Sequence, residues 1–597
     1  MQRAVAIERA KWNLKDVLVS NEGPEYDALL NELESEIREF ENSRNRLRTP
    51  VKEDVVQQLR LYEKISRAMA RLYTYSLMRF SEDTRNQDAK AFVDKTEELR
   101  AEVDNRTLFF RLWWMGLPDS EATRLSPREE DFRYFLELVR RRKPHTLTEP
   151  VEQVINLKNT TGVTGWIHHY EQTTGEFTYV LETAGRKVRD EHGKVKSFAT
   201  GDLVSLFSSP NPRLREASYR ALLTKYASHG VTLGEIYRTI IRDWKNENVK
   251  LRHFPDPISA RNIENDVGGE VVEALLSVCR KNAGVFQDFF RVKAKLLGKK
   301  GMQRYDVYAP LNTKDRKYRF PEAVRSVLEA FDSFDPRFSA LAKRVFNERH
   351  VDSAIRKGKA NGAYCMSVTP KITPYIFLNF AGGTRDLYTI AHESGHAVHD
   401  QLAANHSYLT FQPPLVLAET ASVFAEMVLF DCLMNEETDN DIRRGVLVDK
   451  LSGMYGTICR QSFFVLFEKA AHDAIAGGAT TDKLCSIYLS NLQEQFGESV
   501  NVPKEFKWEW TYVRHFYYTP FYCYAYAFGN LLSLSLYDIY RKEGKSFVPN
   551  YYRILSYGGS ASPSNILGEA GLDIASSAFW ESGFNVLRSM VKQLRKT

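Results

Sequence analysis

The sequence predicts a mainly α-helical protein in which β-structure is confined to short segments. Apolar residues recur at spacings of three and four through residues 1–150, and this periodicity returns from about residue 211 to residue 347. Strand-like composition is limited to residues 159–200 and to the region around residues 358–380. The length of 597 residues argues for two or more packed subdomains.

In the first 200 residues we expect a helical lobe that includes a small strand-containing segment. Leu29, Leu33, Ile37 and Phe40 follow the spacing of an amphipathic helix. Residues 160–164 and 173–180 combine threonine, glycine and β-favouring residues, which predicts short strands and turns near residues 159–200. Residues 201–597 then form a second domain, which holds the candidate site.

The region before residue 385 predicts a strand, a turn and a helix start. Pro374 is followed by a β-rich run to Phe380, and because proline cannot donate to a ladder we expect an edge strand there. Two glycines then turn the chain, and Thr384 is a candidate N-cap for a helix that begins near Arg385.

That helix carries the sequence His392-Glu393-Ser394-Gly395-His396. Two imidazoles four residues apart differ by about 40° around a helix axis, so both can bind one ion. Glu393 lies beside them at about 100° from His392, where a carboxylate can take a proton from water at the ion. The motif predicts a hydrolytic zinc site with Glu393 as the base.

A third ligand is expected from the next apolar segment, residues 416–426. Glu419 and Glu426 are seven residues apart and share a face if this segment is one helix. A carboxylate on a buried helix is costly unless it is paired or bound to metal. We expect Glu419 as the ligand and Glu426 as the acceptor for a ligand histidine. His399 is expected near the site without binding the ion.

An aromatic stretch over residues 510–526 offers hydrogen-bond donors for a reaction intermediate. Hydrolysis of a peptide bond needs a donor near the oxyanion that forms, and histidine or tyrosine can supply it. We select His515, Tyr522 and Tyr524 as candidates, although most of this stretch is typical of an aromatic core.

Together these segments resemble the M3 metallopeptidases, the thimet oligopeptidase and oligoendopeptidase F group. The resemblance is carried by residues 362–365, 378–380, 389–399, 419–426, 515–518, 558–563 and 571–573. Residues 132–155 are similar to the small N-terminal region of the oligoendopeptidase F branch.

The resemblance implies a two-lobed, almost all-helical shell around a deep substrate channel, with a small β-sheet next to the zinc helix. It implies one Zn²⁺ per chain, held by His392, His396 and Glu419. The strand at residues 374–380 would pair with the substrate backbone. His515 and a following tyrosine would hold the cleaved carbonyl, and the substrate-binding residues would be Gly362, Ala363, Tyr364, Asn379 and Phe380.

We therefore expect a zinc-dependent endopeptidase that cuts short, unfolded oligopeptides. A zinc exopeptidase with the same ligands and a catalytically silent peptide-binding relative are the alternatives. The sequence leaves open whether the protein is a monomer or a homo-oligomer.

Composition and charge argue against nucleic acid and membranes as partners. The 82 Lys and Arg residues against 76 Asp and Glu give a net charge of +6, and both signs alternate along the chain. A nucleic-acid-binding protein usually concentrates its basic residues in a stripe, so we expect no nucleic-acid partner. No apolar segment approaches the length that crosses a bilayer, so we expect no membrane partner.

The N-terminal segment and the cysteines predict a cytoplasmic location. Residues 1–9 carry charges and lack the apolar stretch of a signal peptide. All six cysteines lie after residue 278 and none forms a C-x-x-C pair, which favours reduced thiols.

Overall fold

A computed structural model describes residues 11–189, 192–311 and 316–597. These residues are mostly helical with four small sheets, which confirms the predicted fold class. No helix within these ranges is long and apolar enough to cross a membrane. Residues 1–9, on which the prediction of no signal peptide rests, lie outside the described residues.

The chain forms two compact units, each built from three separate stretches of sequence. The first unit combines Met1–Lys143, Asp315–Glu436 and Ile539–Asp573. The second combines Pro144–Lys314, Glu437–Asp538 and Ile574–Thr597. The sequence predicts a helical lobe over residues 1–200 and a catalytic domain over residues 201–597. That division stays a prediction.

The helices of the first unit are α1 (Pro24–Asn42), α2 (Lys52–Glu82), α3 (Gln87–Gly116), α4 (Asp119–Leu125), α5 (Glu130–Arg141), α14 (Phe320–Phe334), α15 (Pro336–Asn347), α16 (Thr384–Leu402), α17 (Leu415–Ala418), α18 (Ser422–Glu436), α24 (Val548–Ser556) and α25 (Pro563–Glu569). The helices of the second unit are α6 (Glu149–Thr161), α7 (Val163–Gly175), α8 (Thr200–Ser205), α9 (Pro212–Ser228), α10 (Gly230–Trp244), α11 (Ser259–Glu264), α12 (Gly269–Lys281), α13 (Ala283–Leu296), α19 (Asn440–Met454), α20 (Arg460–Ala476), α21 (Thr481–Phe496), α22 (His515–Tyr518) and α26 (Ser577–Lys596). Helix α23 (Tyr524–Glu543) contains the boundary at residue 538.

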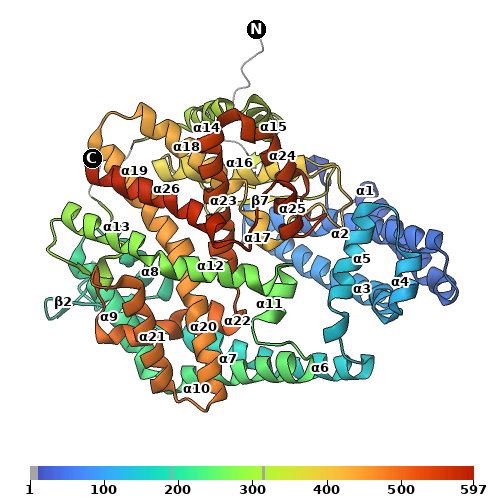
Figure 1. Cartoon of the computed structure of the whole chain (residues 1–597), viewed down its shortest axis with the longest axis horizontal. Helices are drawn as coiled ribbons and strands as arrows, with labels where there is room; N and C mark the ends of the chain where they lie inside the picture. Colours follow the sequence, from blue (N-terminus) through green and yellow to red (C-terminus); the bar gives the residue numbers. More distant parts are fainter. Residues whose placement is uncertain (1–10, 190–191, 312–315) are drawn as a thin grey trace, which may run out of the picture. The chain divides into compact units, whose positions relative to one another are not determined.

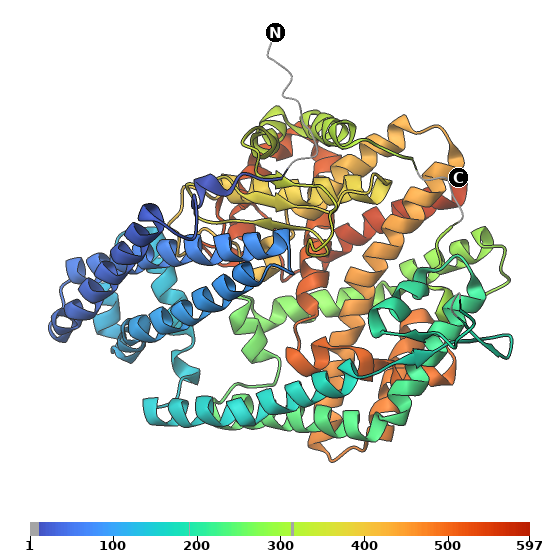
Figure 2. The ribbon, with the colours of Figure 1, turned by 180° about the vertical axis from the view of Figure 1, so that it is seen from behind.

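The core of the first unit lies between its long helices and a small sheet. Helices α1, α2 and α3 pack side by side, in blue in Figure 2. Their apolar faces and the strand residue Phe377 join one buried cluster. Trp12 links the two parts, because its ring lies 5.5 Å from that of Phe377 and its Nε1 donates to Glu82 at 2.7 Å.

Three strands form this sheet in the order β6 (Val351–Asp352), β8 (Tyr375–Phe377), β7 (Tyr364–Met366). Strand β8 pairs in parallel with β6 and antiparallel with β7, so both of its edges are occupied. The prediction of an edge strand at residues 374–380 is therefore wrong. Pro374 precedes β8, so its missing donor is not needed within the ladder. The edge strand next to β8 is β7.

Helix α16 packs against α14, α15, α18 and α24 (Figure 1). Its first turn is fixed by Asp386, whose Oδ2 accepts hydrogen bonds from the backbone of Ala381, Gly382 and Gly383. Thr384 is the first residue of the helix and Gly383 is the N-cap, so the predicted cap is off by one residue. Asp386, the third residue of the helix, accepts hydrogen bonds from free backbone N–H groups, the role that the sequence predicts for the Thr384 side chain.

In the second unit, the predicted strand at residues 160–164 is wrong, since α6 and α7 cover all of it except Gly162. Of the predicted strand at residues 173–180, residues 173–175 belong to α7 and Tyr179–Val180 form a strand. Tyr170 explains this difference: it is fully buried and stacks on Tyr517 with ring centroids 3.8 Å apart. This packing outweighs the weak helix propensity of the threonines. Short strands do occur at β1 (Tyr179–Val180), β2 (Glu182–Thr183), β3 (Arg186–Lys187) and β4 (Ser197–Phe198), while β5 (Met302–Gln303) pairs with β9 (Val500–Asn501).

Candidate metal centre

Helix α16 presents the two histidines of the motif on one face. The Nε2 atoms of His392 and His396 lie 3.2 Å apart, and their rings are nearly perpendicular at 85°. Gly395 lies at the crossing with α18, where a Cβ atom would come within 2.6 Å of the Ala421 carbonyl oxygen. Only glycine lets the two segments approach so closely. The crossing brings the chain around Glu419 next to the histidine pair.

Glu419 lies in a break between two helices, not within one helix as the spacing predicts. Helix α17 ends at Ala418 and α18 begins at Ser422. The break is held by Ser422, whose Oγ donates to Glu419 Oε2 at 2.6 Å, and by Tyr551, whose hydroxyl donates to the Thr420 carbonyl at 3.1 Å. The irregular backbone therefore has defined partners that aim the Glu419 carboxylate.

The three predicted ligands fit a zinc ion. Glu419 Oε2 lies 3.4 Å from His392 Nε2 and 3.7 Å from His396 Nε2. Ligands about 2.05 Å from a tetrahedral zinc are roughly 3.3 Å apart, so these separations suit one ion at their centre. These residues form the one His, Cys, Asp or Glu group found with such spacing in the described part of the chain. The donor set leaves the fourth position for water or substrate.

Both histidines have partners that orient their rings. Glu426 Oε1 lies 2.6 Å from Nδ1 of His392, so Nε2 carries the free electron pair that faces the other ligands. His396 makes a hydrogen bond with the backbone of Ala418, the residue before Glu419. Each ring is therefore held before any ion is bound.

Glu393 lies in the same cavity as the ligands and is 6% exposed. Burial raises the pKa of Glu393 to about 7. A carboxylate whose pKa is close to neutral is well matched to both accepting and returning a proton.

The cavity has a volume of about 350 Å³ and is bounded by three parts of the first unit. Helix α16 contributes the histidines and Glu393, strand β7 contributes Tyr364 and Cys365, and the chain before Glu419 contributes Gln412 and Pro413. His399 also lines the cavity and is 3% exposed, close to the centre but outside the ligand group.

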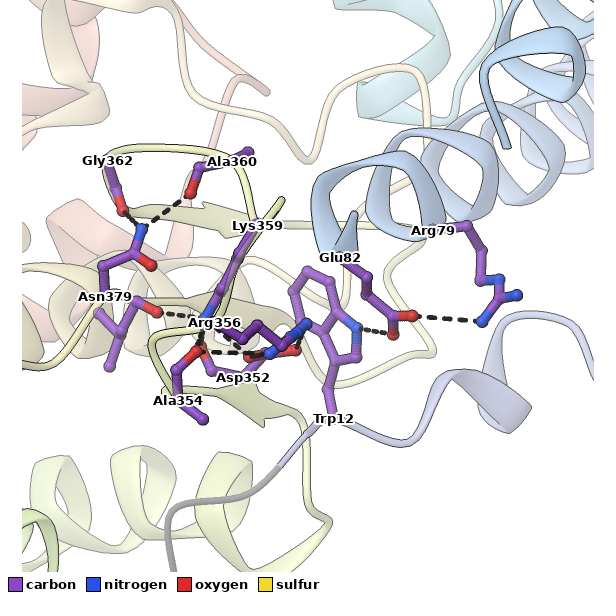
Figure 3. Close-up of polar contacts among 11 residues, drawn as sticks. Trp12, Arg79, Glu82, Asp352, Ala354, Arg356, Lys359, Ala360, Gly362 and Asn379 are labelled. Carbon is purple, nitrogen blue, oxygen red and sulfur yellow. Dashed lines mark hydrogen bonds and ion pairs between the residues drawn. The ribbon is translucent and has the colours of Figure 1, made fainter. Parts of the chain in front are cut away.

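Of the predicted substrate-binding residues, Ala363 and Tyr364 line the cavity. Asn379 supports the loop before β7, because its amide donates to the carbonyls of Ala360 at 2.9 Å and Gly362 at 3.0 Å (Figure 3). Phe380 is 1% exposed and packs on Phe320, so it belongs to the core.

A second group of polar side chains underlies the same loop. Asp352 is fully buried and accepts hydrogen bonds from Arg356 and from Lys359, which also donates to three backbone carbonyls (Figure 3). The Lys359 ammonium lies 4.3 Å from the centre of the Phe377 ring. This ion-pair cluster ties the loop to β6 and β8.

The predicted oxyanion donors lie in the second unit. His515 stacks on Tyr522 with ring centroids 5.7 Å apart, and the hydroxyl of Tyr526 lies 3.4 Å from His515 Nε2. Tyr524 is fully buried and its hydroxyl accepts a hydrogen bond from Asn265 at 2.8 Å. Tyr526 thus joins the pair of His515 and Tyr522, whereas the hydroxyl of Tyr524 bonds Asn265. No sequence signal separates Tyr526 from the neighbouring tyrosines, because α23 begins at Tyr524 and does not contain Tyr522.

Comparison with known proteins assigns the family. The model of peptidase family M3 matches residues 205–586, which is more than half of the chain. The chain belongs to peptidase family M3. The family assignment confirms the resemblance seen in the sequence and makes the protein a metallopeptidase. A second model, described as oligopeptidase F, matches residues 114–179.

Relatives of this M3 peptidase cover nearly the whole chain. It is 27% identical over 542 residues to group B oligopeptidase PepB of Streptococcus agalactiae, covering 89% of this chain and 88% of the relative. It is 26% identical to oligopeptidase PepF of Bacillus subtilis, covering 95% and 84%. A third relative, an oligoendopeptidase F homolog of Borreliella burgdorferi, is 26% identical and covers 99% and 98%.

Solved structures share the fold of this M3 peptidase. A structure from Chlamydophila abortus aligns with a TM-score of 0.87 at 24% identity and covers 98% of this chain and 97% of that one. Oligoendopeptidase-F of Enterococcus faecium aligns with a TM-score of 0.71 at 21% identity, covering 96% and 98%.

Proposed function

We propose that this M3 peptidase is a zinc-dependent endopeptidase that cuts short, unfolded peptides. The observation that carries the proposal is the set of His392, His396 and Glu419 at ligand spacing, with Glu393 in the same cavity. The names of the relatives, oligopeptidase and oligoendopeptidase, support short peptides as substrates and cleavage within the chain.

His392, His396 and Glu419 would hold the ion. When bound, zinc polarises a scissile carbonyl and lowers the pKa of water. Glu393 accepts the proton of the attacking water and passes it to the leaving amine. Glu426 keeps the ring of His392 in the orientation that binding requires.

Strand β7 is the element that can take up the substrate backbone. Strand β8, which the resemblance assigned to this role, is paired on both sides, whereas β7 pairs with β8 alone among the described strands. An extended peptide can add to such an edge. Tyr364 and Cys365 place this edge at the cavity wall.

The oxyanion role of His515 with Tyr522 or Tyr524 stays a prediction, as does the cytoplasmic location. Tyr526 is a third candidate because its hydroxyl lies beside His515.

A substitution of Glu393 tests the proposed function. We expect Glu393→Gln to bind zinc stoichiometrically and to lose more than about 10³-fold in kcat on a quenched fluorescent peptide, since the base is lost while the ligands remain. Elemental analysis and turnover are measured on one preparation, with Glu329→Gln on an exposed surface as control. Near wild-type turnover by zinc-loaded Glu393→Gln would refute the assignment of the base.

A further inference from the structure

One end of the cavity carries polar groups that the proposed hydrolysis does not use. Asp400 lies seven residues after Glu393 and His399 lies three residues after His396, so both continue the catalytic face of α16 toward its C-terminal end. Both line the cavity, together with Ser367 from the chain after β7. Seven residues correspond to about 10 Å along a helix, the distance of a neighbouring side-chain subsite.

Asp400 has no basic partner within the described ranges. The one hydrogen bond to its carboxyl group comes from the hydroxyl of Ser367. Asp400 is half-buried, whereas the fully buried Asp352 and Asp306 are paired with cations: Asp352 binds Arg356 and Lys359, and Asp306 binds Arg215. A carboxylate partly withdrawn from water without a counter-charge is costly, so a cation supplied from the cavity would stabilise it.

His399 offers a second unpaired polar group at the same place. The side chain is 3% exposed, and its Nδ1 is buried without a hydrogen-bond partner among the described residues. Buried polar atoms are nearly always hydrogen-bonded in folded proteins, so an unsatisfied one in a residue that lines the cavity points to a ligand.

We propose that Asp400 and His399 form a subsite that binds a cationic group of the peptide, either a lysine or arginine side chain or a free N-terminal amine. The subsite rests on the proposed peptidase function, because it lies in the same cavity as Glu393. Burial raises the pKa of Asp400 to about 6, so the carboxyl group is mostly ionised at pH 7.5. A side chain bound there would select the cleavage site, whereas a bound terminus would set the distance of the cut from the end.

The experiment uses otherwise neutral ten-residue peptides on the zinc-loaded wild-type protein. A single lysine, N-acetyl-lysine or norleucine is moved along the peptide, and each peptide is made with a free and with an acetylated N-terminus. Product masses give the position of the cut and progress curves give kcat/KM. We expect lysine to be preferred over N-acetyl-lysine by about 10- to 100-fold at one fixed position, the range of a charge-assisted hydrogen bond. If the terminus is the source, the same preference appears for the free amine.

Asp400→Asn should reduce this preference to less than about threefold, and Asp400→Glu, which keeps the charge, should retain part of it. Asp332→Asn, the same change at an exposed position of the first unit, should leave the preference intact. The wild-type comparison of lysine with N-acetyl-lysine decides the matter even if Asp400→Asn does not fold.

Two negative results separate the hypotheses. Cleavage of all peptides at equal rates, whatever the lysine or the terminus carries, would overturn the subsite and leave the proposed function standing. Absence of any cleavage would overturn the proposed function. In that case, fluorescence anisotropy of the same peptides on Glu393→Gln shows whether the cation is still selected.

Discussion

Two glutamates of the metal centre have different roles because of where their oxygens lie. Glu419 Oε2 lies 3.4 Å from Nε2 of His392, on the side of the other ligands. Glu426 Oε1 lies 2.6 Å from Nδ1 on the opposite side of the same ring. In the proposed site, one carboxylate therefore completes the ligand set and the other fixes the tautomer of His392.

Removal of the Glu426 carboxylate should weaken metal binding. We expect Glu426→Ala to lower zinc affinity by about 10- to 100-fold, and Glu426→Gln, which can still accept a hydrogen bond, to lower it less. Competition with a chromophoric chelator measures the affinity. If both variants bind zinc as tightly as the wild-type protein, Glu426 does not support the site.

The grouping of the two histidines could be predicted from sequence because residues four apart on a helix lie on the same side of it. His392 and His396 required only that residues 385–399 be helical. Tyr526 and Asp400 could not be singled out in the same way, because many tyrosines and aspartates are as well placed in the sequence. Their partners, His515 for Tyr526 and the cavity wall for Asp400, come from tertiary packing.

At the scale of elements, the contact between α16 and the start of α18 determines whether the site can form. A Cβ atom on Gly395 would lie 2.6 Å from the carbonyl oxygen of Ala421 and 2.7 Å from the Cα atom of Ser422. Both obstacles are backbone atoms, which cannot turn aside as a flexible side chain can. The two segments would have to separate, and Glu419 would move with them.

We expect Gly395→Ala to destabilise the protein by about 1–3 kcal/mol and to weaken zinc binding, since overpacking shifts the backbone that carries a ligand. Thermal unfolding of metal-free protein and chelator competition measure the two effects. Gly453→Ala is the matched control, because this helical glycine has no atom within 4 Å of the added methyl. The control should be neutral or stabilised by up to about 1 kcal/mol. Equal effects of the two substitutions would contradict the close-contact argument.

Short elements were the least predictable part of the fold. Pro374 correctly marks the start of β8, but strand order depends on β6, whose two residues carry no distinctive pattern. Likewise, the helix expected at residues 416–426 is interrupted at Glu419 by contacts with Ser422 and Tyr551. The intrinsic helix or strand propensity of a segment contains no information about partners that are far away in sequence.

At the scale of the whole molecule, each unit is assembled from distant parts of the chain, and polar contacts secure these parts within a unit. In the first unit, His406 Nδ1 bonds Asp131 of α5 at 2.7 Å and His406 Nε2 bonds the Ser556 carbonyl at 2.8 Å. The backbone N–H of Ser407 donates to the same aspartate at 2.7 Å. No linear division of the sequence predicts this arrangement.

The contact between His406 and Asp131 should make the stability of the protein depend on pH. The hydrogen bond that His406 donates to Asp131 raises the pKa of His406. Burial alone would raise the pKa of Asp131, but hydrogen bonds from His406 and Ser407 outweigh it and lower that pKa. The stabilisation by His406 is complete below about pH 6.5, and it is lost as the pH rises through the higher pKa that His406 has in the folded protein. The stabilisation by Asp131 is lost as the pH falls below about 4.

We therefore expect His406→Gln to lower the melting temperature more at pH 5.5 than at pH 8.5, by an amount equivalent to about 1 kcal/mol. Scanning calorimetry of both proteins at the two pH values measures the difference. Exposed His168→Gln serves as the control. A larger loss at pH 8.5 than at pH 5.5 would give the opposite sign and refute the assigned protonation states.

The bond from Tyr551 to Thr420 has a consequence for biosynthesis. The ribosome completes all three proposed zinc ligands by residue 419, but the tyrosine that bonds the backbone of Thr420 is added 131 positions after Thr420. A nascent chain can therefore carry every ligand while the turn that aims Glu419 is still unsupported. We expect the peptidase to mature late in translation, when little of its own polypeptide remains to be made.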